Sequence, residues 1–263
     1  MLCFPQLSTG SIGQYPIQKR RLSRTVVNDA SDGSRVKLAD PGASAIEWTL
    51  PFESLNDEER SALAALHSAT EGRLGTFTFL DPTDNLLCWS EKLDESVWER
   101  NGLLAITPDV NDPAGGTRAS RLTNNGGGAL AIQQTVNGPG WFRYAFSLQA
   151  RGFDEQQISL VRSTATQAHS ATFRIGPEWR RIVLSGSFTG AEESVTFGIE
   201  LAPGQWIEVY GIQAEAQAGA SGYKQTFSPC GVYSEARFTD DELSLTADGP
   251  NQHSGKLGIR TRG

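Results

Sequence analysis

The stretch NLLCWSEKLDESVWERNG, residues 85–102, decides how this chain is organised. It follows a run at 75–80 that is typical of a finishing strand, and a different kind of sequence begins with it. Its apolar residues stand among Ser, Glu, Asp and Lys at spacings that fit neither strict alternation nor one sustained helix face. We therefore predict that a domain begins here with a strand and a short turn or helical segment, and that Trp98 packs in its core.

Sequence patterns at both ends of the segment 85–226 point to the same kind of module. The stretch 85–102 resembles the opening of a jelly-roll module, similar to carbohydrate-binding modules, that recurs in phage tail and fibre proteins. The resemblance implies a jelly-roll β-sandwich at residues 85–229, inserted into another domain. The matching residues are Asn85, Leu86, Leu87, Ser90, Glu91, Trp98 and Gly102 in the opening, 112–116 with Ala119, Arg121 and Leu122 further on, and Gln213, Glu215, Tyr223 and Thr226 at the close.

Between these patterns, apolar and polar residues alternate as they do in half-buried strands. The clearest run is 141–150, where every second residue from Phe142 to Ala150 is expected to face the core and the residues between them to face water. The runs 178–189, 194–201 and 206–213 repeat the pattern, and Gly and Pro separate them. Such spacing indicates an all-β sandwich or jelly roll.

The flanking segments, 1–84 and 230–263, are predicted to form one discontinuous β domain. The segment 230–263 is too short to fold alone, since roughly forty residues is the practical lower limit. A hairpin is expected from short strands at 24–27 and 35–38 around the turn sequence NDASDG. The one helix is expected at about 56–70, where Asn56 and Glu59 have the spacing of a capping box and Gly72 ends the helix.

The first segment carries a second resemblance. A strand with Trp48, a helix with Leu63 and Leu66, then Gly72, the strand 77–79 and Asp81-Pro82 resemble the N-terminal part of phage distal tail or minor tail proteins, which form rings at the tail tip. The resemblance implies a structural protein of the virion tail tip or baseplate, made in the host bacterial cytoplasm. It also implies a homo-oligomeric ring, a hexamer by the same resemblance, that joins the tail tube to tail-tip and hub proteins.

Charge suggests how such a ring would be held together. Residues 1–15 are expected to form an arm that packs on a neighbour. The basic stretch 18–24 is expected to meet an acidic one, 57–59 or 240–242, of the next subunit in a head-to-tail ring. The alternative for the basic stretch is a solvated loop or strand edge.

Composition excludes several classes of partner. A net charge of −7 and a pI near 5.1 argue against nucleic acid, whose binding needs a basic face. No apolar run approaches the ~20 residues of a membrane-spanning helix, so no membrane insertion is expected. The first residues lack the basic and apolar regions of an export signal, which favours a protein that is made and kept in the cytosol.

The three cysteines, Cys3, Cys88 and Cys230, are too few for a disulfide framework and have no metal-ligand spacing. We interpret them as reduced thiols. One alternative stays open, because Cys88 and Cys230 lie at the two ends of the predicted insertion, where the chain must leave and return at neighbouring points.

No catalytic constellation is visible, so we expect no enzyme activity, no cofactor and no metal site. His67, His169 and His253 lie far apart in the sequence, and His67 and His253 are expected to face solvent. Pairs of neighbouring acids are favoured as surface or capping residues, because glycoside hydrolysis needs two carboxylates on opposite sides of a bond. These pairs are Asp57/Glu58, Glu192/Glu193 and Asp240/Asp241.

Sugar binding would use exposed aromatic residues, for which Trp141 and Trp206 are the candidates. The alternative is that both tryptophans pack in the core or at its rim. The leading hypothesis is a tail-tip ring component whose outward jelly roll attaches to a host-surface glycan. A carbohydrate-binding adhesion or receptor-binding protein outside a ring, and a glycan-acting enzyme, are the other two classes.

Overall fold

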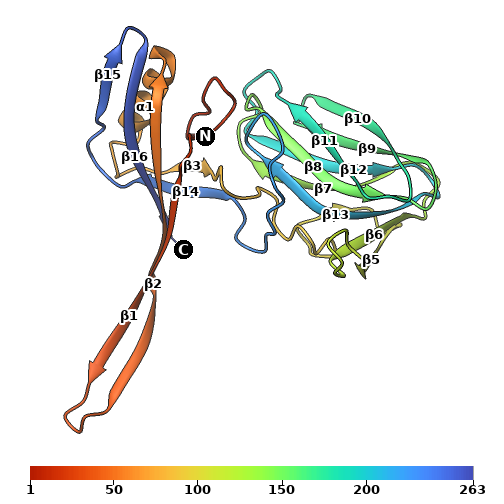
Figure 1. The fold of residues 1–263 in the computed structure, drawn as a ribbon, viewed down its shortest axis with the longest axis horizontal. Helices are drawn as coiled ribbons and strands as arrows, with labels where there is room; N and C mark the ends of the chain where they lie inside the picture. Colours follow the sequence, from red (N-terminus) through yellow and green to blue (C-terminus); the bar gives the residue numbers. More distant parts are fainter. Residues whose placement is uncertain (263) are drawn as a thin grey trace. The chain divides into compact units, whose positions relative to one another are not determined.

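The computed structural model describes residues 1–262 and divides the chain into two compact units, each visible as its own group of strands in Figure 1. Unit 1 comprises Met1–Leu7, Gly13–Phe79 and the chain from Tyr233 onward. Unit 2 comprises Ser8–Ile12 and Leu80–Val232. The sequence placed the limits of the inserted segment at residues 85 and 229.

Unit 1 is built on a six-stranded sheet with the order β1-β2-β16-β14-β3, and β15 pairs with β16. The helix α1 lies beside this sheet in Figure 1. Its elements are β1 (Gln18–Asp29), β2 (Arg35–Leu55), α1 (Asp57–Ala69), β3 (Phe77–Leu80), β14 (Val232–Phe238), β15 (Leu245–Gly249) and β16 (Gln252–Arg262).

The helix α1 begins where the capping box predicts. The Asn56 side chain accepts a hydrogen bond from the Glu59 backbone N–H at 2.8 Å, and the Glu59 carboxylate accepts one from the Asn56 N–H at 2.9 Å. After the helix, the Gly72 N–H donates to the carbonyl of His67, and Gly72 has a φ of 64°. A Cβ at Gly72 would also stand 2.9 Å from the Cα of Asp241, so glycine is required there. The predicted helix is confirmed.

The first seven residues belong to unit 1, and Phe4 packs in its core. Phe4 is fully buried, and its ring lies 5.6 Å from that of Phe79 and 6.0 Å from that of Phe77. The Phe4 N–H donates to the carbonyl of Thr78, which joins this segment to β3. The prediction of a neighbour-packing arm at residues 1–15 is therefore wrong for Phe4, because its ring packs among the aromatic rings of its own unit.

The predicted hairpin exists, but it is much longer than the sequence indicated. β2 pairs with β16 only from Ala45 to Leu55, whereas its pairing with β1 continues outward to Asp29–Arg35. The outer part, residues 24–40, is thus a two-stranded ribbon that projects from the rest of unit 1 (Figure 1). We call it the hairpin arm, and none of its residues is buried.

Unit 2 is a jelly-roll β-sandwich of two five-stranded antiparallel sheets, which confirms the predicted fold class. Their orders are β10-β9-β12-β7-β4 and β11-β8-β13-β6-β5. The strands are β4 (Glu99–Arg100), β5 (Leu104–Val110), β6 (Ala119–Asn124), β7 (Leu130–Asn137), β8 (Tyr144–Arg151), β9 (Gln156–Ser163), β10 (Ala168–Ile175), β11 (Arg180–Gly186), β12 (Ser194–Leu201) and β13 (Trp206–Glu215).

The core of unit 2 lies between these two sheets. The rings of Phe146 on β8 and Phe197 on β12 are 5.5 Å apart, and the two strands belong to different sheets. The predicted inward residues of β8 are buried, but its other face is not wet as expected: Ser147 is fully buried as well. The reason is that Arg181 covers it, donating to the Ser147 hydroxyl at 3.1 Å and to the carbonyl of Ser221.

The residues of the opening and closing patterns hold the two ends of unit 2 together. The Asn85 side chain donates to the carbonyl of Ile212 at 2.9 Å and accepts from the Ala214 N–H at 3.0 Å. The Ser90 hydroxyl accepts from the Thr226 N–H at 3.0 Å and lies 2.8 Å from the Tyr223 hydroxyl. These residues therefore stabilise the fold, and they are not placed to contact a ligand.

Cys88 and Cys230 form a disulfide, so the interpretation of these two cysteines as reduced thiols is wrong. Their Cα atoms are 4.8 Å apart because the chain leaves and returns side by side, with the Gly231 N–H donating to the carbonyl of Asn85 at 2.8 Å. The third cysteine, Cys3, is free, and burial raises the pKa of its thiol to about 12.

The opening stretch itself contains no strand before β4, so the predicted opening strand is wrong. Its backbone is instead folded into successive turns, with the Lys92 N–H donating to the carbonyl of Trp89 and the Trp98 N–H to that of Glu95, both at 3.0 Å. Trp98 is buried as predicted, and its indole N–H donates to the carbonyl of Trp89 at 3.1 Å. Trp98 thus fixes a compact loop against the sandwich.

Candidate functional site

Aromatic and charged side chains gather on the outer face of the sheet β11-β8-β13-β6-β5 of unit 2. Alternation along β13 sends Ile207 and Val209 into the core, where they are buried. The same alternation places Trp206, Glu208 and Tyr210 on the opposite face. This face therefore carries aromatic and charged side chains in the middle of a rigid sheet.

Glu208 is the centre of a row of charged residues that crosses three strands. In the sheet register, Glu208 of β13 is opposite Arg121 of β6 on one side and Arg151 of β8 on the other. Its carboxylate is 2.7 Å from the Arg121 guanidinium and 2.6 Å from the Arg151 guanidinium. The Glu208 side chain is only 5% exposed, whereas both arginines reach the surface.

Aromatic rings cover the other side of both guanidinium groups. The Arg121 guanidinium lies 4.1 Å from the Trp206 ring centroid, and that of Arg151 lies 4.8 Å from the Trp179 ring centroid. Each arginine is thus held between a carboxylate and a ring, which fixes the direction of its remaining N–H groups. The Nε of Arg121 is buried and has no hydrogen-bond partner among residues 1–262.

An exposed ring extends this surface. Phe153, in the turn between β8 and β9, is 76% exposed, and its ring centroid is 6.2 Å from that of Trp206. The set Phe153, Trp206, Arg121, Glu208, Arg151 and Trp179 is called the Trp206 surface below. It combines apolar ring faces with oriented hydrogen-bond donors, the combination that a sugar ring requires for its C–H face and its hydroxyl groups.

A second charged group lies beside Tyr210, in the middle of β13. Arg118 lies over the Tyr210 ring at 5.2 Å and pairs with Asp112 at 3.3 Å and Glu91 at 3.4 Å. Although burial acts in the opposite direction, the backbone N–H groups of residues 118, 116 and 114 lower the pKa of Asp112. Burial raises the pKa of Glu91, and Arg118 partly offsets that rise. These bonds order the loop between β5 and β6, which is a structural task.

The structure does not bring the two predicted sugar-binding tryptophans together. Trp141 is 49% exposed, but it lies before the first residue of β8, and its ring packs edge-on against Phe142. Trp206 lies beside the last residue of β8, since Glu208 pairs with Arg151. The eight residues of β8 span roughly 23 Å at about 3.3 Å per residue, so the two rings belong to opposite ends of the sheet.

The outer face of the other sheet holds a smaller pocket of about 310 Å³. Its polar lining includes Gln157, Ser159, Thr172 and Glu200, and the Ser159 and Thr172 hydroxyl groups are 2.9 Å apart. No aromatic side chain lines it in the part of the chain that the structure describes. The Trp206 surface is therefore the better candidate for binding.

His253 and His67 each lie against other residues of unit 1. His253 lies in β16, is largely buried and pairs with Asp57 at 2.7 Å, so its predicted solvent-facing position is wrong. His67 is 3.3 Å from the carbonyl of Asp240 and packs against Phe238. Within residues 1–262 there is no group of three or more His, Cys, Asp or Glu that could hold a metal ion, and no helix is long and apolar enough to cross a membrane.

Comparison with known proteins finds similarity in fold only. No protein-family model matches the chain, and no curated protein matches it in sequence. Similar solved structures include the enzymatically active domain of tailspike protein 4 of bacteriophage CBA120, at 13% identity and a TM-score of 0.42. That match covers 52% of this chain, which spans only 22% of the tailspike chain.

Carbohydrate-binding modules are also among the similar structures. TmCBM61 in complex with β-1,4-galactotriose is 16% identical with a TM-score of 0.39, and the match covers 49% of this chain and 97% of that one. The CBM22-1 xylan-binding domain of Paenibacillus barcinonensis Xyn10C is 10% identical with a TM-score of 0.41, covering 52% and 97%. Similarity at this level does not indicate a function for this chain.

Sequence reasoning found Trp206 but missed its partners. The alternation of Trp206, Glu208 and Tyr210 against Ile207 and Val209 was a visible signal that charge and rings share one face of β13. Arg121 and Arg151, in contrast, are more than fifty residues from Glu208 along the chain. Only the pairing of β6 and β8 with β13 brings them to it.

Proposed function

We propose that this protein is an attachment component of a phage or phage-derived tail tip, and that unit 2 binds host-surface glycan through the Trp206 surface. The observation that carries this proposal is the pair of arginines held between Glu208 and the rings of Trp206 and Trp179. Such a surface binds without rearrangement, because its donors are oriented before the ligand arrives. The resemblance of the opening and closing patterns to modules of phage tail and fibre proteins supports the tail assignment.

The same geometry favours binding without hydrolysis. The Trp206 surface contains one carboxylate, Glu208, and two arginines occupy it. Glycoside hydrolysis commonly needs two carboxylates placed on either side of the bond. We therefore propose that the protein holds glycan and does not cleave it; release of sugar fragments that stops when Glu208 is changed to Gln would contradict this.

Glycan binding is tested with purified bacterial surface polysaccharide and with a glycan array. Trp206→Ala is expected to weaken binding roughly tenfold, because a ring contact contributes about 1 kcal/mol or more beyond buried area. Phe153→Ala should weaken it less, since Phe153 lies at the edge. Trp141→Ala is the matched control: an exposed aromatic residue of the same unit whose loss should leave binding unchanged.

Two results would contradict this assignment. If Trp141→Ala abolishes binding and Trp206→Ala does not, the site is at the other end of β8. If the protein shows no affinity for any polysaccharide of a bacterium to which the particle adsorbs, the attachment function is wrong.

A second proposal concerns assembly: unit 1 joins copies of this chain into a tail-tip ring through the hairpin arm. Val36 and Leu38 are 50% and 52% exposed on one face of the arm, where Val26 stands opposite Leu38. A two-stranded ribbon is at best marginally stable in water, so an apolar face on it favours a covering partner. A second copy in a head-to-tail ring would cover this face. We propose a hexamer, because the first segment of the chain resembles distal tail proteins.

Ring assembly is measured by light scattering after size exclusion and by negative-stain images. The double variant Val36→Ser with Leu38→Ser is expected to remain monomeric at concentrations where the parent protein forms rings. Val183→Ser, which changes an exposed valine of unit 2, is the control and should assemble normally. A tail map that places the chain as a single axial copy, or outside the tail, would rule out the ring.

A further inference from the structure

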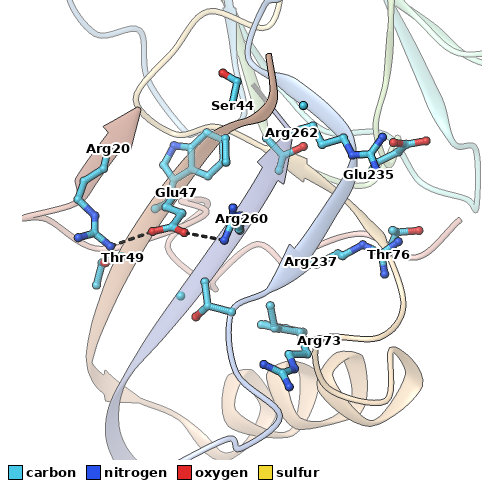
Figure 2. A pocket seen from close by; sticks show the side chains of 17 residues that line it. Arg20, Ser44, Glu47, Thr49, Arg73, Thr76, Glu235, Arg237, Arg260 and Arg262 are labelled. Carbon is cyan, nitrogen blue, oxygen red and sulfur yellow. Dashed lines mark hydrogen bonds and ion pairs between the residues drawn. The ribbon is translucent and has the colours of Figure 1, made fainter. Parts of the chain in front are cut away.

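The sheet of unit 1 has a hollow on one face, with a volume of about 820 Å³. It lies over β2, β16 and β14, and its lining includes Arg20 of β1 and Arg73 and Thr76 of the connection between α1 and β3 (Figure 2). All of its lining residues belong to unit 1. We call it the arginine hollow, because five arginines line it: Arg20, Arg73, Arg237, Arg260 and Arg262.

A row of charged residues crosses the floor of the hollow. Glu47 of β2 is opposite Arg20 on one side and Arg260 on the other, and its carboxylate is 2.8 Å and 3.4 Å from their guanidinium groups. Figure 2 shows the two arginines approaching Glu47 from opposite sides. The row continues to Arg237 of β14, which stands directly opposite Arg260. Like charges placed opposite each other on a sheet are destabilising, so this pair is not explained by the stability of the sheet.

The positive charge of the hollow is only partly neutralised. Two glutamates, Glu47 and Glu235, stand among the five arginines, although the whole chain has a net charge of −7. Arg73 pairs with Asp241 at 2.9 Å, and Arg237 donates to the carbonyl of Leu74. Within residues 1–262, the side chains of Arg262 and Glu235 make no hydrogen bond and no ion pair.

We propose that the arginine hollow binds an acidic peptide segment of a partner protein. Arginine guanidinium groups recognise carboxylates through paired N–H groups. Three strands, β1, β14 and β16, and the connection between α1 and β3 present them here. The glutamates of the hollow indicate a ligand that also donates hydrogen bonds, as peptide N–H groups do. A nucleic acid or polyphosphate offers mainly phosphate acceptors, and it would meet Glu47 and Glu235 as like charges.

An acidic polysaccharide fits this hollow less well than a peptide. The two aromatic residues of its lining, Trp48 and Phe238, are buried at 1% and 3% exposure, so neither presents a ring face to a sugar. The edge of β2 that faces β16 also favours a peptide as the ligand. β16 pairs with β2 as far as Arg262–Ala45, and within the described residues no strand pairs with this edge of β2 from Arg35 to Ser44. Its backbone groups near Gly42 and Ser44 border the hollow and can pair with an extended peptide.

The test uses the full chain and a fluorescent peptide of alternating Glu and Ser, since alternate side chains of an extended peptide face the same way. Fluorescence anisotropy should show binding that falls as ionic strength rises from about 0.1 M to about 1 M, where the Debye length shortens from about 10 Å to about 3 Å. The matched Gln and Ser peptide should not bind. Arg262→Gln should weaken binding roughly tenfold, because it removes charge-assisted hydrogen bonds.

Two variants and one competing ligand keep the test decisive. Arg262 is exposed at the end of β16, so its variant is expected to fold normally, which a melting curve checks. Arg174→Gln, an exposed arginine of unit 2, is the control and should not change binding. Three results would each overturn the proposal. The first is a peptide affinity of the Arg262→Gln and Arg237→Gln variants equal to that of the parent protein. The others are no affinity of the parent protein for the acidic peptide, and tighter binding of a uronic-acid oligosaccharide than of the peptide.

Discussion

Two antiparallel strands of this protein, β8 in unit 2 and β1 in unit 1, show how differently its two units are stabilised. β8 has a partner strand on each side and is almost entirely buried, with Phe146 packed against Phe197 of the facing sheet. β1 is longer, but it pairs with β2 alone and has no buried residue. Backbone pairing therefore holds both strands, whereas side-chain burial holds only β8.

The two units differ in the same way: unit 2 has a closed core, whereas unit 1 has an exposed two-stranded arm and a charged hollow. Unit 2 closes its core between two sheets and joins its ends through Asn85, Ser90 and the Cys88–Cys230 disulfide. Unit 1 exposes the hairpin arm and the arginine hollow. Unit 2 buries its core without help from another chain, which suits a module that binds a ligand on its surface. Unit 1 leaves the hairpin arm and the arginine hollow exposed, which suits a unit that binds other proteins.

Removing the disulfide is expected to have the largest effect, and it should be confined to unit 2. Cys88 and Cys230 are 142 residues apart, for which loop-closure entropy gives on the order of 4–5 kcal/mol as an upper value. Chemical denaturation of the Cys88→Ser, Cys230→Ser double variant should show a lower free energy of unfolding for the transition of unit 2. Cys3→Ser closes no loop and is the control; an equal shift of both transitions would contradict the division into two units.

Two truncations compare the surroundings of β8 and β1: Phe197 of β12 packs against β8, and Leu38 of β2 lies opposite Val26 of β1. Phe197→Ala should cost about 3–5 kcal/mol of the unfolding free energy, because it leaves a cavity between the sheets. Leu38→Ala, in the exposed hairpin arm, should stay within about 0.5 kcal/mol in the monomer. A large loss of monomer stability on Leu38→Ala would mean that the hairpin arm is packed within its own chain, and the assembly proposal would lose its basis.

Acid should weaken unit 2 through Asp112. Its pKa is lowered in the folded state, so the stability it contributes is present above the unfolded value of about 3.9 and is lost as the pH falls through the lower, folded value. Asp112→Asn should cost about 1–3 kcal/mol near neutral pH, because one carboxylate oxygen and the negative charge are lost. The amide oxygen can still accept from the N–H groups of residues 114 and 116, but the N–H of residue 118 then faces an NH₂ group instead of an acceptor. The variant should also unfold with a flatter dependence on pH below about 4.

The smallest expected effect is on the helix of unit 1. Asn56→Ala should lower the unfolding free energy of unit 1 by about 1 kcal/mol, since the Glu59 N–H loses its cap. Thermal melts followed by circular dichroism would measure it, with the exposed Asn28→Ala in the hairpin arm as control. A change in the unit 2 transition instead would show that the helix belongs to a different cooperative unit.

Local chemistry could be predicted well from the sequence. The capping box of Asn56 and Glu59 spans three residues, and the inward residues of β8 follow from strict alternation. Trp98 was expected in the core and is buried there. Each of these features depends on residues only a few positions apart in the chain, so the order of residue types was enough to locate it.

The sequence by itself determined the all-β class, the helix and its cap, and the alternation that puts Trp206 and Glu208 on one face. Only the tertiary structure decided that Cys88 bonds to Cys230, that Phe4 fills the core of unit 1, and that Arg121 and Arg151 share Glu208. The physical reason is distance along the chain. Periodicity and capping are set by bonds between near neighbours, whereas strand register brings together residues tens to more than a hundred positions apart, and no local pattern records which strands will pair.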